Sequence, residues 1–589
     1  MARGISVRTN PNDTRGALKR TLKYLGAYKL LIFLIIVLSI GGNILGLLGP
    51  DFAGKAINEA AAGAGKVNFD RVYYYAKRML VCYLLSSLVT FSISILMTFV
   101  SRRIAGKMRS DVFGKLMKLP VGYFDRNQAG DIISRVSYDI DVISTCLATD
   151  VVQIISSITT VAGSFIMMIV ISPLLSVIAL VTLPLALYYT RWMRGKTQPR
   201  FSKRSKVYGK MNGFVEEMFS GRRTINAYAY DSGVNARYDV INNEAADAYY
   251  DAEFYGVTMG PTVGSINNIG LALVGIFGSV LYLLNRINLG QISSFVLYSR
   301  KFSGPINEVA NIVNELYSAL AAAERVFTLL DEPEEVTDDP DAATLEEVEG
   351  HVEVKNVSFG YLPGKTIIHD LSLDAPPGKL VAIVGPTGAG KTTVINLLMR
   401  FYDVESGGIF VDGKEIRTLT RKSLRKAYAM VLQDTWVFEG TIFDNIAYGK
   451  DNATMEEVVA AAKAAHIHQF ITTLPQGYKT VISEDGGNIS KGQKQLLTIA
   501  RAMLYDARML ILDEATSNVD TDTEKKIQKA MRDLMKDKTC FVIAHRLSTI
   551  RHADWILVFK DGDVIEQGTH KTLMADRGFY YDLYSAQFE

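Results

Sequence analysis

The stretch LVAIVGPTGAGKTTVINLLMR, residues 380–400, decides the fold of the second half of this 589-residue chain. It begins with an apolar run typical of a buried strand and ends with a helical pattern. Between the two, Gly385, Gly390 and Lys391 stand in the spacing of a phosphate-binding P-loop, in the strand, loop and helix context that this motif requires. From residue 351 onward, β-rich runs alternate with helical ones, so we expect an α/β domain built around a P-loop.

The residue types of this loop each have a chemical reason. Glycines allow backbone N–H groups to turn toward a phosphate, and the following helix N-terminus adds its positive dipole. Lys391 is expected to reach the β- and γ-phosphates of a nucleotide, and the Thr392 hydroxyl is expected to bind Mg²⁺. The expected nucleotide contacts in the loop are Gly385, Thr387, Gly388, Gly390, Lys391, Thr392 and Thr393.

A second apolar strand, MLILDE at residues 509–514, delivers two carboxylates at its end. Carboxylates beside a buried strand need a cation or a proton to offset their loss of water. Asp513 suits Mg²⁺, and Glu514 suits a general base that polarises an attacking water. Acidic residues are common at strand ends, so this pair alone would be weak evidence for a catalytic site. The P-loop in the same domain makes the evidence strong.

The first half of the chain is far more apolar than the second. A bilayer-spanning helix needs roughly 20 mostly apolar residues, because the hydrocarbon core is about 30 Å thick and each residue rises about 1.5 Å. Six segments qualify, at residues 30–48, 79–100, 151–171, 174–192, 254–284 and 291–320. We also expect an amphipathic helix over 13–25 on the membrane surface, so the chain is expected to be a multi-pass protein in a lipid bilayer.

Lysine and arginine gather in the two long loops that follow the second and the fourth segments. This bias places both loops, and with them the P-loop domain, in the cytosol at the cytoplasmic membrane. The loops have few helix breakers, so we expect the membrane helices to continue beyond the bilayer. Short helices near 122–131 and 221–230 are expected to dock on P-loop domains, with Phe124 and Tyr228 as contact residues.

Charge and cysteine content exclude several other classes. The net charge of +3 is too small to suggest a nucleic-acid partner, and Cys82, Cys146 and Cys540 lack the spacing of a metal site or a disulfide framework. Residues 331–349 hold ten acidic residues and no basic one, which is typical of a solvated linker. We therefore expect a transmembrane domain over 1–330, an acidic linker over 331–350 and a nucleotide-binding domain over 351–589.

The segment NISKGQKQLLTIAR at 488–501, followed by LILDEATSNVD at 510–520, resembles the signature region of ATP-binding cassette (ABC) proteins. The whole chain resembles the exporter branch of this family, with an α-helical six-span transmembrane domain fused to an α/β P-loop domain. The resemblance implies an ATPase that uses ATP and Mg²⁺ to export hydrophobic or amphipathic compounds, and it points to a bacterial source. Six spans exclude a soluble cassette ATPase, and an importer is disfavoured because importer cassettes are usually separate chains.

The resemblance also assigns roles to single residues. Tyr361 matches the aromatic residue that stacks on adenine, and Gln433 matches the glutamine that contacts Mg²⁺ and water. Asp520 matches the interdomain aspartate, and His545 matches the histidine that senses the γ-phosphate. Each residue type alone is usually a packing or surface residue. The assignment of these roles rests on the order in which all four residues occur along one chain. The presence of Glu514 and His545 favours an ATP-hydrolysing transporter over a nucleotide-gated channel.

The signature implies that a second half-transporter is required. In this family the signature serine and glycine, here Ser490 and Gly492 followed by Gln493, bind the ATP that is held by the opposite subunit. Lys491 departs from the usual glycine. In heterodimeric exporters the subunit that keeps the catalytic glutamate often carries an imperfect signature, so a heterodimer is favoured. A homodimeric lipid or peptide exporter of the same fold is the alternative, and the sequence does not name the cargo.

Arg300 and Lys301 lie about ten residues into the sixth segment. A charge at the bilayer centre costs at least about 2.5 kcal/mol on insertion scales, so such residues usually face a wet cavity or a partner. Long basic side chains near a membrane surface can instead extend to the headgroups. Both interpretations are compatible with the sequence.

Overall fold

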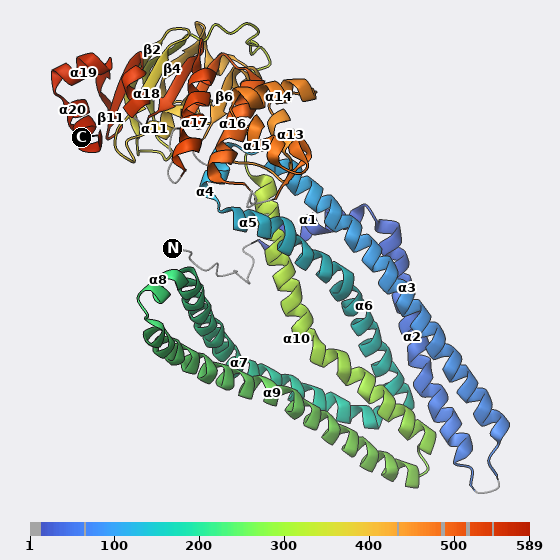
Figure 1. Ribbon diagram of the computed structural model, residues 1–589. Coiled ribbons are helices and arrows are strands. Elements are labelled where there is room, and N and C mark those ends of the chain that lie inside the picture. The colour runs from blue at the N-terminus through green and yellow to red at the C-terminus, as the bar shows by residue number, and fades with distance from the viewer. Residues whose placement is uncertain are drawn as a thin grey trace. The chain divides into compact units, whose positions relative to one another are not determined.

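The computed structural model describes residues 13–63, 66–432, 435–483, 489–513, 519–544 and 547–588, without the side chains of 306–311, 314, 547–549, 587 and 588. The chain divides into two compact units (Figure 1). The first unit comprises Met1–Lys118 and Asn127–Pro333, and the second comprises Leu119–Arg126 and Glu334–Glu589. The short stretch 119–126 therefore groups with the C-terminal half of the chain, although the helices on both sides of it belong to the first unit.

The described residues of the first unit form helices and connecting loops, without strands. Its helices are α1 (Thr14–Gly26), α2 (Lys29–Ala60), α3 (Phe69–Leu116), α5 (Ala129–Ser134), a π-helical turn (Arg135–Asp139), α6 (Ile140–Ile171), α7 (Pro173–Ser220), α8 (Arg222–Ala227), α9 (Asp231–Leu283) and α10 (Leu289–Asp331). The helix expected over 13–25 is confirmed as α1, which Asp13 caps by accepting a hydrogen bond from the Gly16 N–H.

Five of the described helical segments are long and apolar enough to cross a membrane: Lys29–Ala60, Phe69–Leu116, Ala129–Ile171, Pro173–Ser220 and Asp231–Leu283. The sixth expected segment lies in α10, which is helical throughout but is not among these five described segments. Arg300 and Lys301 interrupt its apolar run. At 53 residues, α9 is roughly 80 Å long, more than twice the thickness of the hydrocarbon core, so the expected extension beyond the bilayer is confirmed.

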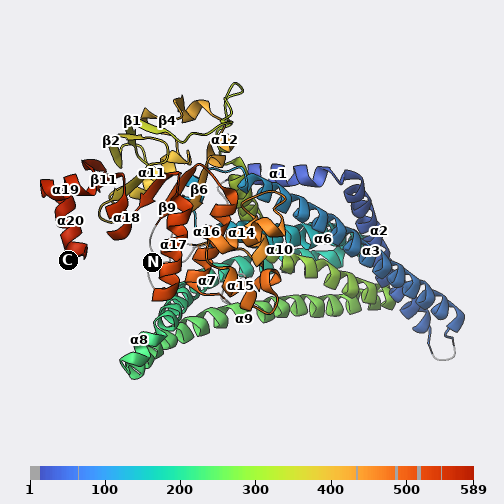
Figure 2. The ribbon, with the colours of Figure 1, turned by 45° about the horizontal axis from the view of Figure 1, so that its top comes forward.

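The helices of the first unit pack in pairs. In Figures 1 and 2, α7 and α9 run side by side and α8 joins them at their far end. The start of α10 approaches α2 closely at Gly54 and Gly290, where a methyl group on Gly290 would lie 2.0 Å from the Gly54 carbonyl oxygen. Nearby, the buried hydroxyls of Ser294 and Tyr298 donate to the carbonyls of Pro50 and Leu47. These bonds satisfy polar groups inside the helix pair.

Within its described residues, the second unit contains three sheets. A six-stranded sheet has the order β12-β11-β3-β10-β9-β6, a four-stranded antiparallel sheet has the order β2-β1-β4-β5, and β7 pairs with β8. The strands are β1 (Val352–Phe359), β2 (Ile368–Ala375), β3 (Leu380–Val384), β4 (Ser406–Val411), β5 (Lys414–Glu415), β6 (Tyr428–Val431), β7 (Gly440–Thr441), β8 (Val481–Ile482), β9 (Met509–Asp513), β10 (Thr539–Ile543), β11 (Trp555–Lys560) and β12 (Asp563–Gly568).

Helices cover the six-stranded sheet. The helices of this unit are α4 (Val121–Arg126), α11 (Lys391–Leu398), α12 (Arg421–Lys426), α13 (Ile442–Ala447), α14 (Met455–Ala464), α15 (His468–Thr473), α16 (Lys491–Tyr505), α17 (Thr521–Met535), α18 (Leu547–His552), α19 (His570–Asp576) and α20 (Phe579–Phe588), with 3₁₀ turns at Ile416–Thr418 and Gly477–Lys479. The central strands are almost wholly apolar and buried, as expected for a parallel sheet with both faces covered. The candidate site lies at one edge of this sheet.

The acidic segment that was expected to be a solvated linker is solvated only in part. Asp338 accepts hydrogen bonds from the backbone N–H and the guanidinium of Arg421 at 2.9 and 2.7 Å. Glu335 accepts from the Arg425 guanidinium at 2.6 Å. Because the Arg421 side chain is only 9% exposed, its charge requires acidic partners. Part of the acidic run therefore neutralises arginines on the surface of the second unit.

Candidate nucleotide-binding site

Three neighbouring strands end at one edge of the six-stranded sheet. Ile543 of β10 is level with Ile383 of β3 on one side and with Asp513 of β9 on the other. Because these strands are parallel, the loop after β3 and the carboxylate at the end of β9 lie at the same edge, separated by one strand. The geometry thus brings the P-loop and Asp513 together, as the sequence predicts.

The P-loop backbone requires glycine at two positions for steric reasons. Gly385 has φ of +151°, and a methyl group there would lie 2.3 Å from the Phe559 carbonyl oxygen. Gly390 has φ of +102°, and its methyl group would lie 2.7 Å from the Ile368 side chain. Gly388, at φ of +85°, faces open space. The loop is therefore packed at its two ends and open in the middle, where a phosphate has room to approach.

Lys391 is the first residue of α11 and its side chain lies within the loop. Its Nζ donates to the carbonyls of Gly385 and Pro386, both at 2.8 Å. Burial lowers the pKa of this amine below its usual value, while the negative charge of Asp513 acts in the opposite direction. The lysine is thus preorganised by two carbonyls and lies within the electrostatic reach of the carboxylate at the end of β9.

The two threonines after Lys391 differ in their surroundings. Thr392 is exposed at the first turn of α11, whereas Thr393 is buried. The hydroxyl of Tyr361 donates to the Thr393 hydroxyl oxygen at 3.2 Å and accepts from the Asn396 side chain at 3.0 Å. Thr392 is therefore free to face a metal or phosphate, while Thr393 holds the tyrosine that was expected to stack on adenine.

The ring of Tyr361 is supported by two further aromatic residues. Phe359 and Tyr402 contact it edge-on, with ring centroids 5.0 and 4.9 Å away. The side chain of Tyr361 is still 38% exposed. An aromatic face next to the first turn of α11 is a suitable platform for a base whose phosphates lie in the loop. Sequence reasoning missed the roles of Tyr402 and Asn396, although both follow the P-loop closely in the chain.

The signature residues begin α16. Ser490 caps the helix, because its hydroxyl accepts from the Gln493 N–H at 3.2 Å and the Gln493 side chain accepts from the Ser490 N–H at 2.8 Å. Lys491 is exposed, whereas Gly492 is buried and a methyl group there would lie 2.5 Å from the Thr523 side chain. The N-terminus of α16 is thus on the surface at Ser490 and Lys491, where the helix dipole can act on an anionic ligand outside the unit.

Asp520 caps the next helix. Its carboxylate accepts a hydrogen bond from the Thr523 N–H at 2.9 Å, and this bond lowers the pKa of the Asp520 carboxyl. Thr523 also lies against Gly492, so the starts of α16 and α17 are neighbours. Three other predicted residues, Gln433, Glu514 and His545, lie outside the described residues, and their roles remain predictions from the sequence.

The short helix α4 belongs to the second unit and packs on Tyr402. The Tyr402 hydroxyl donates to the Asp125 carboxylate, and a methyl group on Gly122 would lie 2.9 Å from the Tyr402 ring. Phe124, the contact residue expected from the sequence, is 41% exposed. In α8, none of the residues is buried and the adjoining Tyr228 is 81% exposed. A short helix near 122–131 thus packs on the second unit, but its contacts are those of Gly122 and Asp125 with Tyr402, whereas the prediction placed it beside the stretch 434–438.

Comparison with known proteins supports a membrane-spanning first unit and a nucleotide-binding second unit. Residues 32–306 match the family described as the ABC transporter transmembrane region, and residues 368–517 match the ABC transporter family. The chain is 42% identical over 586 residues to an uncharacterized ABC transporter ATP-binding protein, YfiC, of Bacillus subtilis, covering 100% of this chain and 96% of the relative.

Two further proteins extend the comparison. A fatty acid ABC transporter ATP-binding/permease protein of Mycobacterium bovis is 41% identical, with 97% of this chain and 96% of the relative covered. The solved structure of a bacterial Atm1-family ABC exporter with ATP bound superposes with a TM-score of 0.74 at 28% identity, covering 98% of this chain and 99% of that chain. The similarity therefore covers both units, the helical unit as well as the P-loop unit.

Proposed function

The chain belongs to the ATP-binding cassette (ABC) transporters of the exporter type, and on this basis we propose that it exports hydrophobic or amphipathic compounds across the cytoplasmic membrane. It is a half-transporter that couples ATP hydrolysis to transport and works as a dimer. ATP binding would bring two cassettes together and open the membrane helices outward, and hydrolysis would reset them.

The observation that carries this proposal is the edge of the six-stranded sheet. There the buried Lys391, held by two loop carbonyls, lies within the electrostatic reach of Asp513, in the same chain as five helices apolar enough to cross a membrane. Lys391 would bind the phosphates, Tyr361 would support the adenine, and Glu514 would polarise the attacking water. His545 would contact the γ-phosphate.

The residues at this edge also fit a magnesium ion. Mg²⁺ prefers oxygen ligands and is usually held by one or two protein groups together with substrate phosphates. Thr392 offers an exposed hydroxyl, and Asp513 offers a half-buried carboxylate at the end of β9. We place Gln433 beside them on the basis of the family pattern. The ion would neutralise charge that develops on the phosphates during transfer.

The placement in the membrane follows from charge. Basic residues accumulate in the C-terminal parts of α3 and α7, beyond the apolar segments of these helices. This charge bias favours a cytosolic location for these parts and for the nucleotide-binding domain. In this arrangement residues 1–330 form the transmembrane domain, 331–350 the acidic connection and 351–589 the nucleotide-binding domain. The name of the mycobacterial relative, a fatty acid transporter, supports lipid-like cargo for this chain.

A transport assay tests the function directly. Inside-out membrane vesicles that contain the chain should accumulate fluorescent amphipathic dyes or fatty acids when ATP is added, and vesicles with the Glu514→Gln variant should not. Accumulation that does not depend on ATP, or that persists at the parental rate in the Glu514→Gln vesicles, would contradict the proposal.

We favour a heterodimer over a homodimer for the working assembly. Lys491 stands where the family pattern has glycine, while Glu514 retains the residue type of a catalytic base. A pair of chains with complementary defects would then share the two ATP sites. Purification of the tagged chain, expressed alone in cells that lack a related exporter, decides the question: a stable dimer with full ATP turnover would establish the homodimer instead.

A further inference from the structure

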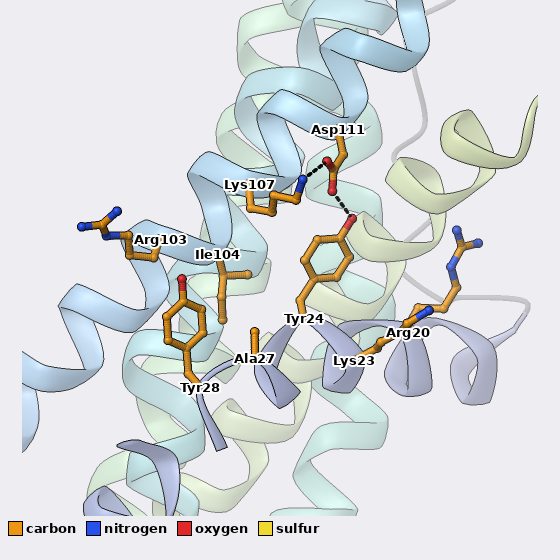
Figure 3. A pocket seen from close by; sticks show the side chains of 9 residues that line it. All are labelled: Arg20, Lys23, Tyr24, Ala27, Tyr28, Arg103, Ile104, Lys107 and Asp111. Atoms are coloured by element: carbon orange, nitrogen blue, oxygen red, sulfur yellow. Dashed lines mark hydrogen bonds and ion pairs between the residues drawn. The ribbon is translucent and has the colours of Figure 1, made fainter. Parts of the chain in front are cut away.

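A cavity of about 750 Å³ lies between α1 and the part of α3 that follows its apolar segment. It is lined from the α1 side by Arg20, Lys23, Tyr24, Ala27 and Tyr28, and from α3 by Arg103, Ile104, Lys107 and Asp111. Figure 3 shows the two tyrosine rings reaching toward α3, with Arg103 at one side of the pocket and Lys23 at the other. This pocket is part of the first unit and is separate from the nucleotide site.

The charges of the pocket are unbalanced. Lys107 forms an ion pair with Asp111 at 2.7 Å, and Arg20 forms an ion pair with Asp331 outside the pocket. Lys23 has no hydrogen bond or ion pair within the described part of the chain. Arg103 contacts only the ring of Phe99, 5.3 Å from its guanidinium, in the same described part. The pocket therefore offers two cations without an anionic partner.

The Tyr24 wall of the pocket is held by a hydrogen bond and a ring contact, and the lining is partly apolar. The Tyr24 hydroxyl donates to Asp111 at 3.0 Å, and its ring stacks on Phe327 with centroids 6.2 Å apart. Burial and the bond to Asp111 raise the pKa of Tyr24 to about 12, so it remains a neutral donor at physiological pH. The Tyr28 ring, which lies beside the buried Ile104, gives the pocket an apolar surface next to its charges.

The position of the pocket places it at the membrane surface. α2 begins at Lys29, directly after the Tyr28 wall, and its first turns expose Leu30 at 80% and Phe33 at 66%. On α1, Leu18 and Leu22 are also more than 40% exposed. Apolar residues exposed in this way next to a membrane-crossing helix are typical of contact with lipid. The pocket therefore lies at the depth of the lipid headgroups.

From these observations we propose that the pocket binds the anionic headgroup of a phospholipid from the adjoining leaflet, with the cations of Lys23 and Arg103 at its two sides attracting the negative charge and the Tyr28 ring contacting the glycerol and upper acyl chain. The two cations attract a negatively charged headgroup, and the apolar wall suits a ligand that carries hydrocarbon. A small soluble anion would use the cations but would gain nothing from the apolar wall.

Native mass spectrometry of the full-length assembly in detergent tests this assignment. The probes are phosphatidylglycerol, phosphatidylcholine and inorganic phosphate. We expect saturable binding of phosphatidylglycerol, much weaker binding of phosphatidylcholine and no displacement by phosphate. Lys23→Gln combined with Arg103→Gln should weaken phosphatidylglycerol binding by about tenfold or more, because each basic residue near an anionic lipid contributes substantially to its attraction.

A matched control separates the pocket from general surface charge. Lys19 and Arg102 are exposed residues of the same two helices that do not line the cavity. Lys19→Gln combined with Arg102→Gln should leave binding of phosphatidylglycerol unchanged, and the charge-conserving pair Lys23→Arg and Arg103→Lys should restore most of it. Equal losses in the pocket and control variants, or no loss in either, would overturn the proposal. Displacement of phosphatidylglycerol by equimolar phosphate would overturn it in favour of a soluble anion.

Discussion

The hydroxyl of Tyr402 donates a hydrogen bond of 2.5 Å to the carboxylate of Asp125, across 277 positions of sequence. Burial and this bond raise the pKa of the Tyr402 phenol, so it stays a neutral donor at physiological pH. Because the Tyr402 ring also contacts Tyr361, helix α4 lies one aromatic ring away from the expected adenine platform. The chain joins α4 directly to helices of the first unit, so this contact is a suitable route for coupling ATP binding to transport.

Removing the hydroxyl of Tyr402 or the charge of Asp125 should weaken this hydrogen bond and reduce coupling. In Tyr402→Phe and Asp125→Asn variants, we expect basal ATP hydrolysis to stay within about twofold of the parent and dye transport per ATP to fall severalfold, because a charge-assisted bond is worth roughly 1.5–3 kcal/mol. Phe124→Ser is the control, since this side chain is exposed. Coupling that is lost in Phe124→Ser but kept in Asp125→Asn would favour the contact expected from the sequence.

The P-loop glycines should differ in what they contribute. Gly390→Ala brings a methyl group to 2.7 Å from Ile368 at a φ of +102°, whereas Gly388→Ala meets open space at a similarly positive φ. A left-handed conformation costs a non-glycine residue about 1–2 kcal/mol, so both variants lose this free energy of folding. Only Gly390→Ala adds a steric clash. Without nucleotide, thermal unfolding should therefore show Gly390→Ala as the less stable. An equal or reversed order would contradict the packing of the loop described above.

Glu514→Gln should abolish most turnover while ATP binding persists. The amide keeps the shape of the side chain but cannot accept a proton, and general base catalysis contributes about 10²–10⁴-fold to such rates. Steady-state hydrolysis and nucleotide affinity, measured on the same purified assembly, check both halves of this expectation. A parental rate of hydrolysis would show that another group acts as the base.

The sequence predicted those parts of the structure that depend on local patterns. The strand and helix around the P-loop, the carboxylate at the end of β9 and the helix over 13–25 all follow from residues close together in the chain. One contact between distant residues was missed. Tyr402 and Asp125 are 277 positions apart, and the sequence pattern pointed instead to the larger and more apolar Phe124.

The acidic segment shows the same limit. Ten acidic residues without a basic one predict solvation, because no local partner is present. The partner of Asp338 is Arg421, 83 positions later, and that of Glu335 is Arg425, 90 positions later. Only the tertiary structure brings these opposite charges together, so composition alone could not distinguish a free linker from a docked one.

Asp338→Ala should destabilise the second unit measurably. It removes the acceptor of two hydrogen bonds from the nearly buried Arg421, and a hydrogen bond to a charged group is worth about 1.5–3 kcal/mol. Glu346→Ala is the control, because this residue is exposed and should change stability by less than about 0.5 kcal/mol. Denaturant unfolding of the full-length protein compares the two variants. Equal stabilities would show that the whole acidic run is a solvated linker.

Arg300 and Lys301 have different surroundings on α10. Arg300 is exposed, whereas Lys301 is partly buried and its Nζ lies 4.0 Å from the position that a methyl group on Gly46 would occupy. The Lys301 ammonium therefore points toward α2, inside the helix pair, and an exposed Arg300 can extend toward headgroups or a partner subunit. The two interpretations of these charges can thus apply to different residues.

We expect Lys301 to influence the choice of cargo and Arg300 to have little effect. A cation held inside the helices favours anionic compounds and disfavours cationic ones, since its field is weakly screened there. Lys301→Gln should therefore shift transport in vesicles from anionic toward cationic dyes, with basal ATP hydrolysis nearly intact, whereas Arg300→Gln should leave the order of preference unchanged. If both single variants and the double variant transport anionic, neutral and cationic dyes in parental proportions, then neither charge faces the transport path, and extension of both side chains to the membrane surface is the better account.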